Sequence, residues 1–183
     1  MEADADDIIF RPAWRLDDSQ IVEDVRRMWS QIGLRPRIID KRVTELCATA
    51  YSGDKLVAVS TAYIFDDRYM RNKFFGYRCM TIPEFRQHNL AWRITAYSRK
   101  ILQDWTAHNP EQRILGLLID VETDKYEEGL LHPVREGFGM TLHFVGYTPE
   151  GNQLRAIWFD NAKLDDRAVK REVFSPPPYL PAR

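Results

Sequence analysis

A segment in the middle of the chain combines residue types that suit the binding of a phosphate group. It leaves an apolar, strand-like run, passes Pro83, and enters a long helical pattern that starts near Leu90. A helix that follows a tight loop presents unpaired backbone N–H groups and the positive end of its dipole, which attract anions. Arg86 adds a cation at the edge of the loop, and small Ala91 lets a pyrophosphate approach the first turn. These residues predict an anion site, although neither of the glycine-rich phosphate-binding motifs is present; the alternative is an ordinary strand-to-helix connection.

The histidines and cysteines indicate other chemistry only weakly. Cys47 and Cys79 lie in strand-like runs without forming a CxxC pair, so we expect two reduced core residues rather than a disulfide. Cys79 near His88 suggests a nucleophile, but an apolar setting raises the pKa of a thiol, and a buried structural role is the expectation. We expect no metal site, because no H-E-x-x-H motif or helical i, i+4 pair occurs among the four histidines, at positions His88, His108, His132 and His143.

The elements that position the loop follow from hydrophobic periodicity. A capping pattern at Asp17 and a stop at Gly33 bound one amphipathic helix, and His108-Asn109-Pro110 ends a second that starts near residue 90. Period-two and continuous apolar runs predict strands over 8–13, 45–51, 55–65, 74–82, 114–121, 141–147 and 154–159.

This order predicts an α/β (α+β) fold with a mixed, mostly antiparallel central sheet of about six to seven strands and helices on both faces. The segment from 74 to 121 should form the one parallel crossover, with right-handed connection. We expect a single domain over 1–164 and a charged, proline-rich tail over 165–183. The run 175–181 should be extended and polyproline-like, docking on its own domain or on a second copy, which would give a homodimer.

Composition narrows the class of protein. The chain has 183 residues, of which 44% are hydrophobic, and a formal net charge of −1, as suits one globular domain. No run approaches the roughly 20 apolar residues that cross a bilayer, and no secretory signal is evident, so we expect a cytoplasmic protein without membrane contact. Near-neutral charge argues against bulk electrostatic binding of nucleic acid. The basic runs 41–42 and 68–73 suit an acidic acceptor or nucleic acid, although a solvated face is the commoner explanation.

With the elements in this order, the loop resembles the signature of the GCN5-related N-acetyltransferases (the GNAT family). In that signature an aliphatic residue is followed, after any one residue, by Pro. A loop of the form [RQ]-x-x-G-x-[GA] then opens a helix. Here Arg86, Leu90 and Ala91 fit, while Asn89 stands where glycine is usual. Asn is the least costly replacement for glycine in a left-handed backbone. The resemblance extends over about residues 8–160 and includes Gly137-Phe138, which is similar to the family's Gly-Phe after its fourth helix.

The resemblance implies that acetyl-CoA, or another acyl-CoA, is the co-substrate, with no metal. The strand before the loop would pair through its backbone with the pantetheine arm, and the thioester would lie in a slot between about Thr81 and Asp120. The residues that the resemblance assigns to the cofactor are Met80, Thr81 and Ile82 on the strand, and Arg86, Gln87, His88, Asn89, Leu90 and Ala91 in the loop and helix start.

Acyl transfer to an amine needs a base for the ammonium and an acid for the departing thiolate. Glu122, at the end of the central parallel strand, is the first candidate for the base, and Asp120 is the second. Many family members use a Tyr before Gly-Phe as the acid, and counting back places Pro133 at that position. Tyr126 or His132 would have to substitute; each also has the simpler interpretation of a surface or packing residue.

The leading hypothesis is an acyl-CoA-dependent N-acyltransferase that acts on an amine acceptor by direct transfer. A second hypothesis is a non-catalytic CoA-binding or protein-interaction module with the same fold, motivated by the departures at Asn89 and Pro133. A third is an acyltransferase-like enzyme acting on a nucleic-acid base, suggested by the basic run 68–73 alone. Neither the acceptor nor the acyl group follows from the residues.

Overall fold

The computed structural model describes residues 7–121 and 128–164, and all structural statements below refer to them. The elements are β1 (Ile8–Pro12), α1 (Ser19–Gln31), α2 (Pro36–Val43), β2 (Leu46–Ser52), β3 (Lys55–Asp67), β4 (Asn72–Thr81), the 3-10 helix η2 (Pro83–His88), α3 (Leu90–His108), the short 3-10 turn η3 (Pro110–Gln112), β5 (Ile114–Val121), α4 (Glu128–Leu131), β6 (Val134–Gly137), β7 (Met140–Tyr147) and β8 (Gln153–Trp158).

The described strands form one sheet in the order β1-β2-β3-β4-β5-β8-β7-β6. Every neighbouring pair is antiparallel except β4 and β5, which are parallel and joined through α3. The expected fold class and the single parallel crossover are therefore confirmed. The strand number was wrong, because the sheet has eight strands rather than six to seven. The additional strand is β6, whose four residues are too few to show a hydrophobic period.

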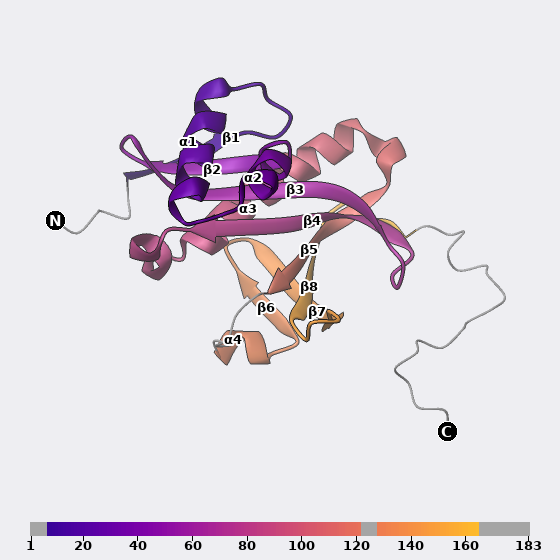
Figure 1. Cartoon of the computed structure of the whole chain (residues 1–183). Coiled ribbons are helices and arrows are strands. Elements are labelled where there is room, and N and C mark those ends of the chain that lie inside the picture. The colour runs from indigo at the N-terminus through magenta and orange to yellow at the C-terminus, as the bar shows by residue number, and fades with distance from the viewer. Residues whose placement is uncertain (1–6, 122–127, 165–183) are drawn as a thin grey trace.

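Helices cover both faces of the β1–β4 half of the sheet, as expected. Figure 1 shows α1 and α2 on one face and α3 on the other. The side chain of Asp18, not Asp17, caps α1 by accepting a hydrogen bond from the N–H of Ile21, at 3.0 Å. The helix α2 was not predicted, because it has eight residues and a single buried side chain, Ile39.

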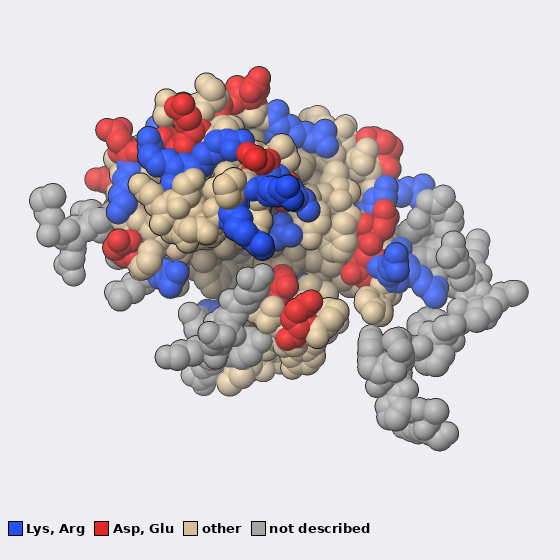
Figure 2. All heavy atoms as spheres, viewed as in Figure 1, with Lys and Arg blue, Asp and Glu red and all other residues tan. Residues whose placement is uncertain are grey.

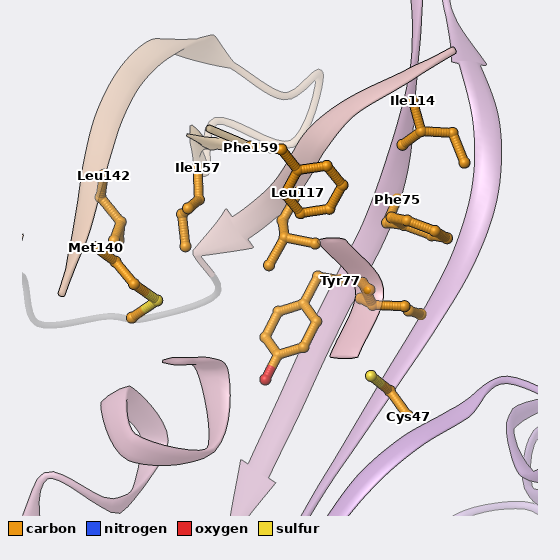
Figure 3. Close-up of a cluster of buried hydrophobic side chains, with 11 residues drawn as sticks. Cys47, Phe75, Tyr77, Ile114, Leu117, Met140, Leu142, Ile157 and Phe159 are labelled. Carbon is orange, nitrogen blue, oxygen red and sulfur yellow. The ribbon is translucent and has the colours of Figure 1, made fainter. Parts of the chain in front are cut away.

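A cluster under α3 holds the two halves of the sheet together. Figure 3 shows Phe75 and Tyr77 of β4 beside Leu117 of β5, with side chains of β7 and β8 completing the cluster. Leu117 is fully buried, as is Leu102 of α3 in the same cluster. The parallel joint between β4 and β5 is therefore fixed by apolar packing on the α3 face.

Candidate functional site

The parallel pairing of β4 with β5 stops before either strand ends. The last pair is Tyr77 with Ile119. Beyond it β4 stays paired with β3 as far as Thr81, and β5 stays paired with β8 as far as Val121. The two strands follow different partners, so they diverge and open a gap in the sheet at their carboxyl ends, which Figure 1 shows below β4. Open sheets bind ligands at such an edge.

One margin of this gap is a strand edge made of backbone groups. The N–H of Ile82 donates to the carbonyl oxygen of Val57 on β3, at 3.0 Å. Backbone groups alternate in direction along a strand, so Ile82 and Met80 face β3, while Thr81 and Cys79 face the gap. No described strand residue pairs with Thr81 or Cys79 on that side. An extended ligand could pair there as an added strand.

The β4 margin leads directly into the loop that the sequence singles out. Asn89 has φ 52° and ψ 24°, the left-handed conformation that the expected glycine would adopt. This result agrees with the interpretation that Asn replaces glycine at this position. The loop is anchored by Phe85, which is buried and whose N–H donates to the carbonyl oxygen of Ile82, at 3.1 Å.

The start of α3 keeps the properties of an anion site. The carbonyl oxygen of Asn89 accepts the first helical hydrogen bond, from the N–H of Arg93 at 3.0 Å, and no described side chain caps the helix. Ala91 and Arg86 are exposed, whereas Leu90 is fully buried and fixes the helix against the sheet. Gln87 and His88 lie in η2. The exposed, uncapped helix start leaves backbone N–H groups available to a phosphate.

The candidate catalytic residues lie on the other margin or beyond it. Glu122 and Tyr126 fall outside the described residues. Asp120 is exposed and directly follows Ile119, the last residue of β5 in the parallel pairing. Ile119 packs toward the cluster under α3, so alternation directs Asp120 to the opposite face of the sheet.

His132 is exposed, and its place is fixed through its backbone. The fully buried Arg155 donates from Nη1 to the carbonyl oxygen of His132, at 3.0 Å, and from Nη2 to that of Leu130, at 2.5 Å. The guanidinium also bonds Gln153 through Nε, at 2.9 Å. Arg155 therefore ties the connection between α4 and β6 to β8, next to the β5 margin.

The expectation that Cys79 is a buried core residue is wrong. It is an exposed residue, because β5 has diverged from β4 at this position. Thr95 of α3 directs its hydroxyl to the sulfur, at 3.9 Å, and the atoms around the sulfur desolvate the thiolate and raise the pKa of the thiol. Cys47 is buried as expected, and burial raises the pKa of its thiol to about 12. A nucleophilic role for Cys79 is not favoured.

The Gly137-Phe138 pair occurs in a different setting from the one that the resemblance implied. The strand β6 separates the pair from the described part of α4, and the pair ends β6 and forms the turn to β7, with φ 52° at Phe138 and 71° at Gly139. Phe138 stacks on Trp92 of α3 with ring centroids 6.3 Å apart. Counting back along a helix to Pro133 therefore has no structural basis, because Pro133 lies in the connection before β6.

A pair of charged residues that the sequence did not suggest lies beside the gap on the α2 side. Arg78 follows the last parallel pair on β4, and its Nη1 is 3.3 Å from Oε2 of Glu45. The guanidinium lies over the ring of Tyr63, 4.7 Å from its centroid. Figure 2 shows further Lys and Arg side chains over α2 and the middle of this face. Such pairs of distant residues leave no local sequence pattern.

The described residues were also compared with the requirements of a metal site and of a membrane-spanning helix. Within the described ranges, no cluster of three or more His, Cys, Asp or Glu side chains is arranged to hold a metal ion. None of the described helices has the length and apolar character needed to span a bilayer.

No protein-family model and no curated protein matches this chain. Among solved structures it is similar to Ard1 from Thermoplasma volcanium (12% identity, 83% of this chain and 96% of the other, TM-score 0.43). It is also similar to a mutant of KacT (12%, 82% and 95%, TM-score 0.46). A third is an acetyltransferase of the GNAT family from Streptococcus pneumoniae (12%, 82% and 96%, TM-score 0.40).

Proposed function

We propose that this protein is an acyl-CoA-dependent N-acyltransferase with a GNAT-type fold, acting on an amine. The observation that carries the proposal is the gap between β4 and β5, whose backbone edge continues into the uncapped start of α3. A strand edge for an extended amide chain and a helix start for a pyrophosphate lie in the order in which CoA presents these groups. Acetyl-CoA is the expected donor.

The residues around the gap fit CoA in type and exposure. The backbone of Thr81 faces the gap and can pair with the amides of the pantetheine arm. Exposed Ala91 presents no bulky side chain to the pyrophosphate, and exposed Arg86 supplies a positive charge. When bound, acetyl-CoA supplies an activated acyl group as a thioester.

The protein's part in the chemistry is to move protons. The acceptor ammonium must lose a proton before its nitrogen can attack, and the departing sulfur must gain one. We assign the base to Glu122, with Asp120 as the second candidate, and the acid to Tyr126 or His132. Exposed Asp120 and His132 belong to segments that border the β5 margin, where a proton can be exchanged with solvent.

One observation favours the non-catalytic alternative. Gly137-Phe138, which in the family follows the segment that carries the usual acid, is placed in a hairpin turn after β6. A protein that binds CoA and transfers nothing would retain the β4 margin and tolerate this change.

Titration calorimetry with acetyl-CoA and desulfo-CoA, followed by a thiol-release assay over a panel of amines, tests the proposal. We expect both CoA compounds to bind, and only acetyl-CoA with an accepted amine to release thiol. Tight binding of both without release for any amine would favour the non-catalytic module. Failure of both to bind would exclude the proposed cofactor site.

A further inference from the structure

A cavity of about 710 Å³ lies between the β3–β4 turn and the β7–β8 hairpin. Its size lies in the range of small-molecule sites, about 300–1,000 Å³. It is lined by Asp67, Tyr69, Met70, Phe144, Val145, Gly146, Tyr147, Thr148, Pro149 and Leu154.

The cavity is linked to the β5 margin of the gap by a row of residues that pair directly across β5, β8 and β7. Leu154 of β8, which lines the cavity, is the direct cross-strand partner of Asp120 on β5. Direct partners in an antiparallel pair place their side chains on the same face, so Asp120 lies beside this wall. Gly146 of β7 is the next partner in the row, and a Cβ there would meet no atom within 4 Å. The cavity wall is therefore open at Gly146, and Leu154 lies between Gly146 and Asp120 in this row.

The lining defines the chemical class of the occupant. Seven of the ten lining residues carry apolar or aromatic side chains, so the cavity favours an apolar group. Among the described residues that line the cavity, Asp67 is the only charged one, so this lining favours a cation over an anion. The hydroxyl of Thr148 is buried without a hydrogen-bond partner in the described part of the chain, which leaves polar capacity in the wall.

We propose that this cavity binds the acceptor, and that the acceptor is a primary amine with an aromatic or branched apolar substituent. The inference rests on the proposed function. The apolar substituent occupies the cavity, and the ammonium lies toward Asp120. In the transfer, the amine loses its proton to Asp120 or to water. Its nitrogen then forms the C–N bond as the C–S bond breaks, and the thiolate takes up a proton.

The test separates binding from transfer. Ligand-observed NMR and calorimetry first measure the binding of 2-phenylethylamine and 3-methylbutylamine without any CoA, with ethylamine and spermidine as comparison amines. Thiol release with acetyl-CoA is then measured for the same four amines. We expect the two apolar amines to bind, and their kcat/KM to exceed that of ethylamine by at least tenfold.

Two exposed lining residues provide variants that should fold. Tyr147 is 66% exposed and Tyr69 is 72% exposed, so Tyr147→Ser and Tyr69→Ser remove cavity wall without opening the core. Each should weaken binding of 2-phenylethylamine by about tenfold, by loss of aromatic contact. Ile9→Ser, at an exposed apolar position on the opposite edge strand β1, is the matched control and should change nothing.

The outcomes distinguish the inference from the function on which it rests. Binding of the apolar amines that both Tyr variants weaken supports the cavity, even if acetyl-CoA binding or transfer fails and excludes the proposed function. Transfer to ethylamine or spermidine with no preference for apolar amines would overturn the cavity assignment and leave the acyltransferase in place. Binding that neither Tyr variant weakens would also overturn it.

Discussion

The two margins of the gap between β4 and β5 use different parts of the chain. The β4 margin is made of backbone: a strand edge at Thr81, a left-handed residue at Asn89 and an uncapped helix start. The β5 margin offers side chains, among which Asp120 is exposed and pairs across the strands with Leu154, a residue that lines a cavity. Binding through backbone groups would tolerate a change of residue type such as Asn in the place of glycine, whereas acid–base chemistry depends on particular side chains. The comparison predicts that changes on the two margins separate binding from turnover.

The largest effect is expected on the β4 margin. Ala91→Glu places a carboxylate at the helix start, where it repels the pyrophosphate, so acyl-CoA binding should fall below detection by calorimetry. The protein should remain folded, because Ala91 is exposed.

Ala107→Glu is the control, since Ala107 is also exposed and lies near the other end of α3. It should bind acetyl-CoA normally. Unchanged affinity in a folded Ala91→Glu variant would contradict the assignment of the β4 margin to the cofactor.

On the β5 side the expected effect is on turnover alone. Glu122→Gln keeps the shape of the side chain but cannot accept a proton, so kcat should fall by roughly 10² to 10⁴ while acyl-CoA affinity is retained. Steady-state thiol release from pH 6 to 10 measures this change in kcat. Tyr126→Phe and His132→Ala should then identify the acid, and only one of the two should matter.

Full activity of Glu122→Gln would move the role of base to Asp120, for which Asp120→Asn is the corresponding variant. If Glu122→Gln lowered both acyl-CoA affinity and kcat, this would contradict the assignment of binding to the β4 margin and of turnover to the β5 margin.

The joint that fixes the two margins should be sensitive to truncation. Leu117→Ala removes a fully buried side chain from the cluster that packs β4 and β5 under α3, and should lower the free energy of unfolding by about 2–5 kcal/mol. Leu154→Ala, at a half-buried position on the opposite face, should cost roughly half as much. Urea denaturation compares the two. Equal losses would show that the two faces contribute alike to the joint.

The backbone at residue 89 should respond to shape rather than to polarity. Asn89→Val forces a β-branched residue into the left-handed region, at a cost of about 1–2 kcal/mol, and should weaken acetyl-CoA binding through distortion of the loop. Asn89→Gly should leave both stability and affinity close to those of the natural chain. Thermal unfolding and calorimetry measure both effects. Weakened binding in Asn89→Gly would instead assign the Asn side chain a role in recognition.

The smallest effect is expected at the C-terminus, whose residues 165–183 lie outside the described part of the chain. The run 175–181 contains four prolines, which exclude helix and central strand, so deletion of 175–183 should leave the circular dichroism spectrum unchanged. Global unfolding would show that this segment is part of the domain.

Local sequence pattern was sufficient to predict those elements whose conformation depends on residues close together in the chain. The stripe that includes Leu90, Ile94 and Leu102 predicted α3, and all three are fully buried. The departure at Asn89 was interpretable because left-handed backbone strain depends on a single residue. The strands on either side of the loop were predicted from local pattern too, because a continuous apolar run such as 114–121 is longer than a turn.

Tertiary structure decided what depends on pairing between distant segments. Cys79 belongs to an ordinary apolar strand in the sequence, yet it is exposed, because β5 leaves β4 after Tyr77 to follow β8. The short elements α2 and β6 likewise exist through contacts that no local period encodes. The cavity that Leu154 lines lies between two turns about 80 residues apart, and the register and twist of the whole sheet bring these turns together. The sequence by itself therefore predicted the loop and helix start of the β4 margin, and only the folded sheet determined what lies across from it.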